Sequence, residues 1–377
     1  MTTLYKHQQE FLKQNPDKAL LCWEMRCGKS LPAVIWGAKR KSTLVVCPKQ
    51  LKQDWIHNFT KNVEFKDLEV LTKEEFKKQY TKLKKFHSLI VDESHTFASP
   101  LFTRGRSQLS TAMYNFIKDN PDMDVLLLTA TPIRNDPSSL HTLLCFIGIY
   151  IPWKAWREEF YELKHMPYLP RPAYFPVKDW RQNIKKYLEK YASIVSLQDV
   201  VDYLPPVTEE VVEIKPTKSK GKFEKWTDEH LYEQSEKAKF IKGLGYRKII
   251  IVAHYTAQID ELEKALKNER PVFIMDGRSK DPAKVIKEAQ ESDECYFIVQ
   301  ASMGVGFDGY MFGAMVFASM SHSVVAHTQM FGRLRHLQHL KPLMYYYLIG
   351  GKWDKRIYES IKVGEDFNPH KYRNEIT

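Results

Sequence analysis

Short apolar runs rich in β-branched residues recur along the chain, separated by longer stretches with helical spacing. Such runs are typical of parallel strands buried on both faces, and they are far shorter than the ~20 apolar residues that cross a bilayer. Because runs of this kind alternate with helix-like segments, we predict an α/β fold with two doubly wound parallel sheets. The runs are ALLCW, TLVVCP, SLIVDE and VLLLTAT in the first part of the chain and KIIIVAH, CYFIVQ and AMVFAS in the second.

Length and local composition predict two lobes joined by a connector. A chain of 377 residues suits two domains of roughly 150 residues each with a linking segment. Residues 150–180 are crowded with aromatics and prolines, and residues 216–230 form a lysine-rich stretch typical of an exposed hinge. We predict a first lobe at residues 1–148, a connector or insertion with hinge at 149–235, and a second lobe at 236–377.

The aromatic side chains between Trp153 and Trp180 allow two interpretations. They could stack on nucleic-acid bases or act as a strand-separating wedge. Packing of the connector onto one lobe is the simpler use of large apolar rings, and we favour it.

The charge balance favours a polyanionic partner. Lys and Arg number 57 against 46 Asp and Glu, a formal net charge of +11, and basic side chains gain free energy by releasing counterions from phosphates. Five cysteines without C-x-x-C spacing argue against a disulfide framework and a zinc finger, and they fit a reducing cytoplasm. The N-terminus, MTTLYKHQQEF, lacks the apolar segment of a signal peptide, so we expect neither export nor membrane insertion.

The segment WEMRCGKS, residues 23–30, occupies the place of a phosphate-binding loop between a predicted strand and a predicted helix. In such a loop a glycine lets the backbone approach phosphate, a lysine reaches the β and γ oxygens, and a hydroxyl ligates Mg²⁺. We assign these roles to Gly28, Lys29 and Ser30. The usual first glycine, five positions before Gly28, is Trp23, so the general motif is incomplete.

Asp92 and Glu93 directly follow the apolar run SLIV. Two acids at the end of a buried strand are costly unless they hold a cation or a water molecule, although an isolated pair could also be a solvated strand end. Because the chain also contains the Gly-Lys-Ser segment upstream, we favour a functional pair. We predict that Asp92 ligates Mg²⁺ and that Glu93 orients the attacking water. Together the two segments predict a site for nucleotide phosphates and Mg²⁺, in which Lys29, Asp92 and Glu93 are the predicted catalytic residues of this lobe.

The first part of the chain resembles the superfamily-two helicases, and within them the Swi/Snf-like branch. LYKHQ, residues 4–8, looks like the glutamine motif, and WEMRCGKS looks like the D-E-M-G-L-G-K-T of that branch. TLVVCPKQLKQDW resembles motif Ia with its proline and downstream tryptophan, and DESH is a DExH box. LLLTATPIRNDPSSLHTLLCFI resembles motif III followed by the T-P-x-x-N extension of the branch.

The second part continues the resemblance in order. IIIVAHYTAQIDELEKAL looks like motif IV, and IMDGRSK looks like the L-D-G-x-T step that follows it. SMGVGFDG resembles motif V, and QMFGRLRH resembles motif VI, Q-x-x-G-R-x-x-R. The matching segments span residues 4–336.

The resemblance implies a nucleic-acid motor that binds ATP between two RecA-like lobes and hydrolyses it when they close. Gln8 would contact adenine, Thr129 and Thr131 would couple hydrolysis to nucleic-acid contacts, and Arg333 or Arg335 would reach the γ-phosphate as an arginine finger. Further predicted nucleotide contacts are Met25, Arg26, Cys27, Gly306 and Asp308. The predicted nucleic-acid contacts are Lys49, Gln50, Thr129, Thr131, Ser302 and Gly304.

Two positions depart from the resembled motifs. Arg26 stands where the Swi/Snf-like loop has glycine; a loop residue facing solvent is the favoured interpretation and a phosphate contact is the alternative. The last arginine of motif VI is replaced by His336, with Arg335 one place early. Neighbouring positions on a helix differ by about 100° in direction, so Arg335 could substitute only if the backbone is locally distorted or the motif is loop-like.

We therefore predict an ATPase stimulated by nucleic acid, which moves along or remodels duplex DNA without sequence preference. The alternatives are a strand-separating DNA or RNA helicase and a catalytically weak protein that binds nucleic acid under the control of ATP. DNA is the expected partner, RNA is less favoured, and neither a membrane nor zinc is expected.

Overall fold

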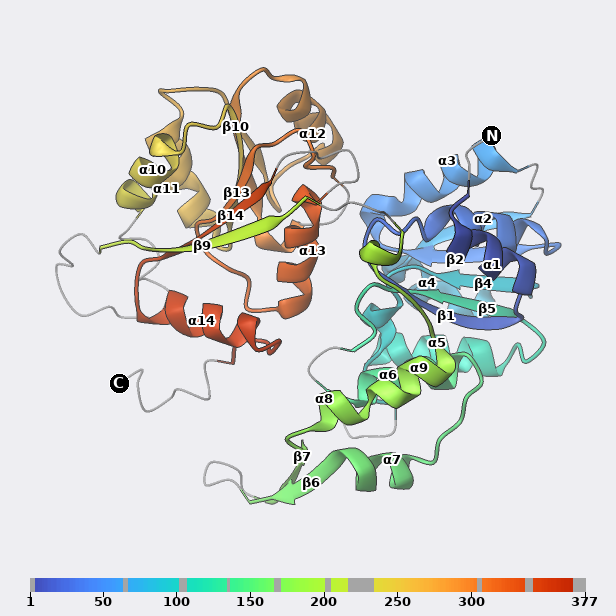
Figure 1. The fold of residues 1–377 in the computed structure, drawn as a ribbon. Helices are drawn as coiled ribbons and strands as arrows, with labels where there is room; N and C mark the ends of the chain where they lie inside the picture. Colours follow the sequence, from blue (N-terminus) through green and yellow to red (C-terminus); the bar gives the residue numbers. More distant parts are fainter. Residues whose placement is uncertain are drawn as a thin grey trace. The chain divides into compact units, whose positions relative to one another are not determined.

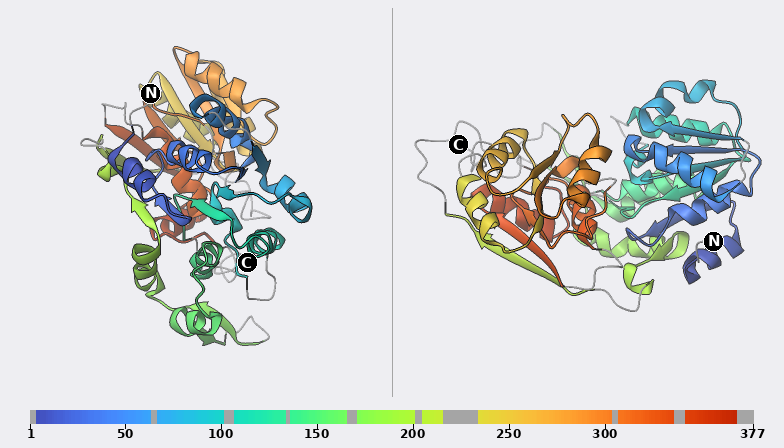
Figure 2. Two further views of the ribbon diagram at one scale, coloured as in Figure 1. Left: turned by 90° about the vertical axis from the view of Figure 1, so that its right-hand side faces the viewer. Right: turned by 90° about the horizontal axis from the view of Figure 1, so that it is seen from above.

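The computed structural model describes residues 4–63, 67–101, 107–133, 136–165, 171–200, 205–215, 234–303, 307–335 and 342–368. The chain forms two compact units, one comprising Met1–Asp202 and the other Tyr203–Thr377. Each unit contains a parallel sheet of six described strands, with helices packed on its faces (Figures 1 and 2). The predicted class, α/β with two doubly wound parallel sheets, is confirmed.

The first unit has the strand order β3-β2-β4-β5-β1-β8. Its strands are β1 (Lys18–Trp23), β2 (Thr43–Cys47), β3 (Leu68–Thr72), β4 (Ser88–Val91), β5 (Asp124–Leu128) and β8 (Ser193–Val195). Its principal helices are α1 (Lys6–Gln14), α2 (Ser30–Ala38), α3 (Lys52–Asn62), α4 (Lys73–Gln79), α5 (Gln108–Lys118) and α6 (Ser138–Phe146). Short 3-10 turns include η1 (Lys49–Leu51), η2 (Tyr80–Lys82), η3 (Ser94–Phe97) and η4 (Leu197–Asp199).

Both faces of this sheet are covered. On one face Phe76 of α4 and Phe116 of α5 pack with Leu44 and Leu127 of the strands in one buried cluster. Helices α2 and α3 contact β4 and β3, and Trp36 of α2 is fully buried. The carboxyl ends of β1, β4 and β5 therefore carry the residues that follow them to one edge of the sheet, where ligands bind in such folds.

Most of the predicted connector belongs to the units themselves. After α6 the chain forms α7 (Trp153–Phe160), the antiparallel pair β6 (Tyr161–Lys164) and β7 (Ala173–Pro176), α8 (Trp180–Asn183) and α9 (Lys185–Tyr191). Trp156, Phe160 and Trp180 are buried in the core of the first unit, as the packing interpretation expects. The division between the two units falls within the predicted connector, so its described residues up to 200 group with the first unit and residues 205–215 group with the second.

The second unit has the strand order β11-β12-β10-β13-β14-β9. Its strands are β9 (Val207–Glu213), β10 (Lys248–Ala253), β11 (Val272–Met275), β12 (Cys295–Gln300), β13 (Ala314–Phe317) and β14 (Leu343–Ile349). Its helices are α10 (Gln234–Gly243), α11 (Thr256–Leu266), α12 (Pro282–Glu291), α13 (Val324–Leu334) and α14 (Lys352–Lys362), with the 3-10 turn η6 (Ala301–Met303).

Alternate residues of these strands enter two separate cores. Ile250 faces a cluster that includes residues of α13 and α14, whereas its neighbour Ile251 faces a cluster that includes residues of α10 and α11. This alternation follows from the opposite directions of successive side chains in a strand. It explains why the runs predicted as strands are apolar throughout.

All seven apolar runs singled out in the sequence form strands, namely β1, β2, β4, β5, β10, β12 and β13. The five cysteines are buried as free thiols. Within the described ranges no helix combines the length and apolar character needed to cross a membrane.

Candidate functional site

The loop between β1 and α2 folds around the Lys29 ammonium. Gly28 adopts φ +72°, the left-handed region that favours glycine. Lys29 Nζ donates hydrogen bonds to the carbonyl oxygens of Trp23 at 2.8 Å and Glu24 at 3.0 Å. Burial lowers the pKa of Lys29, and the nearby Glu93 carboxylate opposes this shift. A bound phosphate would offer the ammonium anionic oxygens in place of these two carbonyls.

Helix α1 holds Gln8 against this loop. Gln8 Nε2 donates to the carbonyl oxygen of Gly28 at 2.8 Å, and Gln8 Oε1 accepts from the backbone N–H of Tyr5 at 2.8 Å. His7 Nε2 lies 2.8 Å from the carbonyl oxygen of Cys27. The structure thus brings the glutamine predicted to contact adenine to the loop predicted to hold phosphates.

The two departures in the loop each have a local explanation. The Trp23 indole N–H donates to Ser193 Oγ at 2.8 Å, and its ring packs edge-on against His7 with centroids 4.5 Å apart. Trp23 thus joins the sheet edge to α1. Arg26 has φ +68°, a left-handed backbone conformation that is strained for arginine and that glycine adopts freely.

Strand β8 and the residues that follow it contact the same loop, although they lie near the end of the first unit's sequence. Glu24 N–H donates to Val195 O at 2.8 Å, and Cys27 Sγ lies 3.8 Å from the same oxygen. The Glu24 carboxylate accepts a hydrogen bond from the N–H of Leu197. Sequence reasoning missed Val195, Leu197 and Ser193, since no local motif marks residues so far from the loop.

Asp92 and Glu93 follow β4 at the same edge of the sheet. Asp92 Oδ2 accepts from the Trp55 indole N–H at 2.9 Å, and Asp92 Oδ1 accepts from the backbone N–H of Glu93 at 2.9 Å. Burial, with a contribution from Glu93, raises the pKa of Asp92 to about 6. Glu93 has φ +48°, a strained conformation that turns the chain sharply after the strand.

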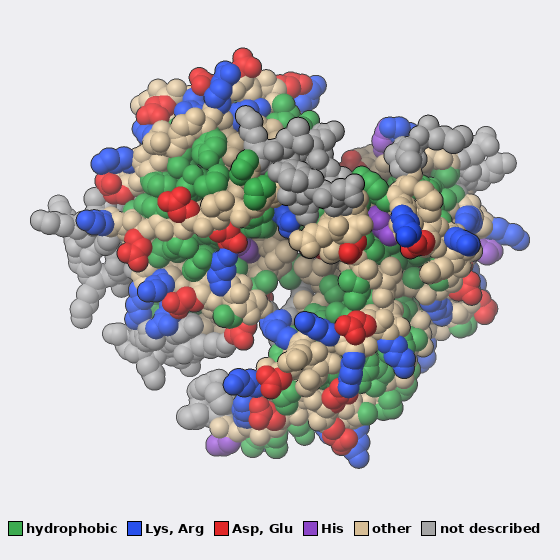
Figure 3. Space-filling model, viewed as in Figure 1, with side chains coloured by type: hydrophobic (Ala, Val, Ile, Leu, Met, Phe, Trp, Pro, Cys, Tyr) green, Lys and Arg blue, Asp and Glu red, His purple; other side chains and the backbone are tan. Residues whose placement is uncertain are grey.

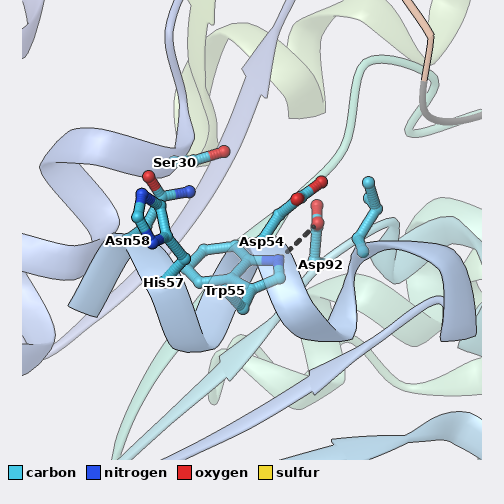
Figure 4. A pocket seen from close by; sticks show the side chains of 7 residues that line it. Ser30, Asp54, Trp55, His57, Asn58 and Asp92 are labelled. Atoms are coloured by element: carbon cyan, nitrogen blue, oxygen red, sulfur yellow. Dashed lines mark hydrogen bonds between the residues drawn. The ribbon is translucent and has the colours of Figure 1, made fainter. Parts of the chain in front are cut away.

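A cavity of about 350 Å³ lies beside Asp92 (Figure 4). The residues that line it are Ser30, Leu51, Asp54, Trp55, His57, Asn58 and Asp92. Mg²⁺ usually takes one or two protein oxygens together with phosphates and waters, and the Ser30 hydroxyl and Asp92 carboxylate fit that donor set. Among the described residues, no group of three or more His, Cys, Asp or Glu side chains is arranged as a metal site.

His95 joins the predicted catalytic acid to the predicted coupling threonines. Its Nδ1 lies 3.2 Å from Glu93 Oε2, 3.1 Å from Thr129 Oγ1 and 3.4 Å from Thr131 Oγ1. Thr129 Oγ1 also accepts from the backbone N–H of Thr131 at 3.0 Å. His95 and Thr129 are buried. The sequence places His95 in the DExH box but does not reveal this network.

The other predicted contacts of the first unit lie in different settings. Lys49 and Gln50 are exposed in η1, directly after β2. Met25 is half-buried in the loop after β1, and Cys27 is fully buried there. Burial raises the pKa of the Cys27 thiol to about 11.

In the second unit, Ser302 is exposed in η6, and Asp308 follows it after a gap in the described residues. Arg333 lies in the last turn of α13, and one guanidinium nitrogen donates to Phe307 O at 3.1 Å. Helix α13 ends at Leu334, and Arg335 has extended backbone. Gly304, Gly306 and His336 lie outside the described residues.

Comparison with known proteins identifies the family. The model of the SNF2-related domain matches residues 69–270, more than half of the chain. The chain belongs to the SNF2-related domain family. The matched range includes the Asp92-Glu93 pair and the T-P-x-x-N extension after β5. A search of curated proteins gives no match.

Solved structures give a weaker likeness. A variant of S. cerevisiae Dbp5 bound to Gle1 and IP6 is 13% identical, with a TM-score of 0.54 over 100% of this chain and 88% of that one. This similarity extends to the fold alone. The Sulfolobus solfataricus SWI2/SNF2 ATPase core in complex with dsDNA is 12% identical, with a TM-score of 0.43 over 99% of this chain and 92% of that one.

Membership in the SNF2-related family confirms the resemblance to superfamily-two helicases of the Swi/Snf-like branch. Families of this superfamily are ATPases, so at this level the chain is an ATP-using enzyme. The roles of individual residues remain predictions, and the helical end at Leu334 bears on one of them. Because Arg335 lies beyond the helix, helical direction alone does not prevent it from taking the place of residue 336.

Proposed function

We propose that this SNF2-related chain is an ATP-dependent translocase or remodelling helicase that acts on duplex DNA without sequence preference. The observation that carries the proposal is the position of His95. Its imidazole lies within hydrogen-bonding distance of both Glu93 and the two threonines Thr129 and Thr131. One side chain thereby connects the acid proposed to act on water with the residues proposed to sense nucleic acid.

The first unit supplies the groups for phosphoryl transfer to water. Lys29 exchanges its bonds to the loop carbonyls for bonds to the β and γ phosphates, and Gln8 contacts the adenine. Ser30 and Asp92 would hold Mg²⁺, which would supply positive charge against the phosphates. Glu93 accepts a hydrogen bond from the water and directs its oxygen toward the γ-phosphorus.

The His95 network gives a route from nucleic-acid contact to hydrolysis. A phosphate that displaces Thr129 or Thr131 changes the partners of His95 Nδ1, and therefore the orientation of Glu93. Coupling of this kind requires a shared group with two arrangements rather than mere proximity. Arg333 or Arg335 of the second unit completes the charge balance at the γ-phosphate in this proposal.

The dispersed basic charge supports a nucleic-acid partner that is bound through its phosphates. Figure 3 shows Lys and Arg side chains over much of the viewed face, intermixed with Asp and Glu. The net charge of +11 favours binding that is steeply salt-dependent and largely independent of sequence. We also propose a cytoplasmic location, which the free thiols support because disulfides are rare in that compartment.

The test is ATP turnover with a matched panel of nucleic acids at one fixed salt concentration. Duplex DNA, single-stranded DNA and RNA of equal length are compared, each in two unrelated sequences. Duplex DNA should stimulate turnover at least as well as single strands, with little dependence on sequence. Stimulation by RNA alone would favour the strand-separating helicase, and nucleic-acid binding without turnover would favour an ATP-controlled binding protein.

His95→Ala tests the coupling route separately from hydrolysis. We expect it to retain ATP binding but to lose most of the stimulation by DNA. His87→Ala is the matched control, since His87 precedes β4 at the opposite end of the strand and bonds Ser42 Oγ at 2.8 Å. Equal stimulation in the two variants would refute the route through His95.

A further inference from the structure

Trp55 contacts a predicted magnesium ligand without belonging to the predicted site. Its side chain lies on α3 and is 2% exposed. The indole N–H donates to Asp92 Oδ2 at 2.9 Å, and the Glu93 backbone N–H donates to Asp92 Oδ1 at 2.9 Å. Each oxygen of this buried carboxylate thus has a donor from the protein.

Two donors on opposite oxygens restrict rotation of the carboxylate. Hydrogen bonds to an ionised acceptor are roughly twice as strong as neutral ones, so loss of either leaves the charge less well stabilised. A carboxylate offers about four lone-pair sites, so these two bonds leave capacity for a metal ion or its water. Figure 4 shows the Asp92 carboxylate joined to Trp55 beside the cavity that Ser30 also lines.

We propose that Trp55 is a positioning residue for Asp92, which it holds in the orientation needed to bind the magnesium of Mg²⁺·nucleotide. The inference rests on the proposed function, because that function assigns Mg²⁺ to Ser30 and Asp92. Partners that orient a metal ligand from behind typically change metal affinity or activity by about 10–100-fold when removed. A shift of that size in Mg²⁺ dependence is the expected signature of Trp55.

Two replacements remove the N–H and keep an aromatic ring. Trp55→Phe retains an apolar ring beside Phe59, whose centroid lies 6.3 Å from that of Trp55. Replacement by 3-benzothienylalanine keeps the shape of tryptophan and lacks only the N–H, so it serves if the phenylalanine variant does not fold.

Trp36→Phe is the matched control. Trp36 is fully buried in the same unit, and its indole N–H donates to Pro16 O at 2.8 Å. This variant loses a buried indole hydrogen bond of similar length that does not involve Asp92. Any general effect of such a loss on stability is therefore common to the Trp36 and Trp55 variants.

The experiment measures binding of a fluorescent ADP analogue by anisotropy while Mg²⁺ is titrated, with EDTA as the metal-free reference. For Trp55→Phe we expect the Mg²⁺ concentration at half-maximal effect to rise tenfold or more, with unchanged binding in EDTA. Trp36→Phe should superimpose on the parent. A parental titration in both Trp55 replacements, or equal shifts in the Trp36 and Trp55 variants, would overturn the positioning role. Absence of Mg²⁺-dependent ADP binding in the parent would instead overturn the proposed function.

Discussion

Gly28→Ala should be more damaging than an ordinary substitution at a left-handed glycine. A Cβ atom at Gly28 would lie 2.4 Å from Gln8 Nε2, so the Gln8 side chain must move. Alanine in the left-handed region costs about 1–2 kcal/mol. Displacing Gln8 also removes its bonds to Gly28 O and from Tyr5 N–H, which are worth about 0.5–1.5 kcal/mol each. The free energy of unfolding of Gly28→Ala should therefore fall by about 2–5 kcal/mol in total.

Gly148→Ala is a control that separates the conformational cost of a left-handed alanine from the clash with Gln8. Gly148 has φ +81°, and its added Cβ would meet only the Lys18 side chain, with the nearest atom at an ordinary 3.7 Å. Lys18 begins β1, whereas the phosphate-loop candidate follows the end of that strand. The free energy of unfolding of this variant should fall only by the cost of a left-handed alanine, about 1–2 kcal/mol.

Urea unfolding followed by tryptophan fluorescence measures the stability difference, and anisotropy of a fluorescent ADP analogue measures nucleotide affinity. Gly28→Ala should weaken binding at least tenfold, and Gln8→Ala should reproduce part of that loss without the backbone cost. Gly148→Ala should bind nucleotide as the parent does. Equal destabilisation of the two alanine variants, with parental binding in both, would refute the argument that Gln8 packs against the loop and shapes it.

Three further variants test other parts of the chain. Lys237→Met leaves the buried Asp354 carboxylate without the Lys237 Nζ that lies 3.0 Å away, so urea unfolding should show a loss of about 3–5 kcal/mol. Adding Asp354→Leu should recover much of it, and no recovery would contradict this cause. Arg26→Gly relieves a left-handed backbone and should leave ATP affinity unchanged; a marked rise in the KM for ATP would indicate a phosphate contact instead. Arg333→Ala should lower turnover by orders of magnitude with ATP binding retained, and near-parental turnover of the Arg333→Ala, Arg335→Ala double variant would refute both finger assignments.

Strands buried on both faces were predictable because their signature, a continuous apolar run, lies within a few consecutive residues. The runs that became β4 and β10 are apolar at every position, as burial on two faces requires. Strand β9, which reads VTEEVVE, has a largely exposed surface at the sheet edge and so lacks that signature. Strand β8 has only three residues, and its pairing with β1 spans some 170 positions of sequence.

The same distinction holds for the candidate site. Gly28, Lys29 and Ser30 are consecutive, so their chemistry appears in the sequence as a motif. The bond from Trp55 to Asp92 joins residues 37 positions apart, and the one from Leu197 to Glu24 joins residues 173 apart. No spacing rule marks such pairs, because the strand order brings them together. Sequence patterns therefore predict the groups proposed for chemistry better than the contacts that hold them.

Phosphate release from ATP, with and without duplex DNA, is the most direct measurement of the proposed function when parent and Glu93→Gln are compared. Duplex DNA should stimulate the parent. Glu93→Gln should still bind nucleotide but hydrolyse it about 10²–10⁴-fold more slowly, the usual contribution of a general base. Parental turnover in Glu93→Gln, or a parent that no nucleic acid stimulates, would contradict the assignment of this chain as a nucleic-acid-driven ATPase.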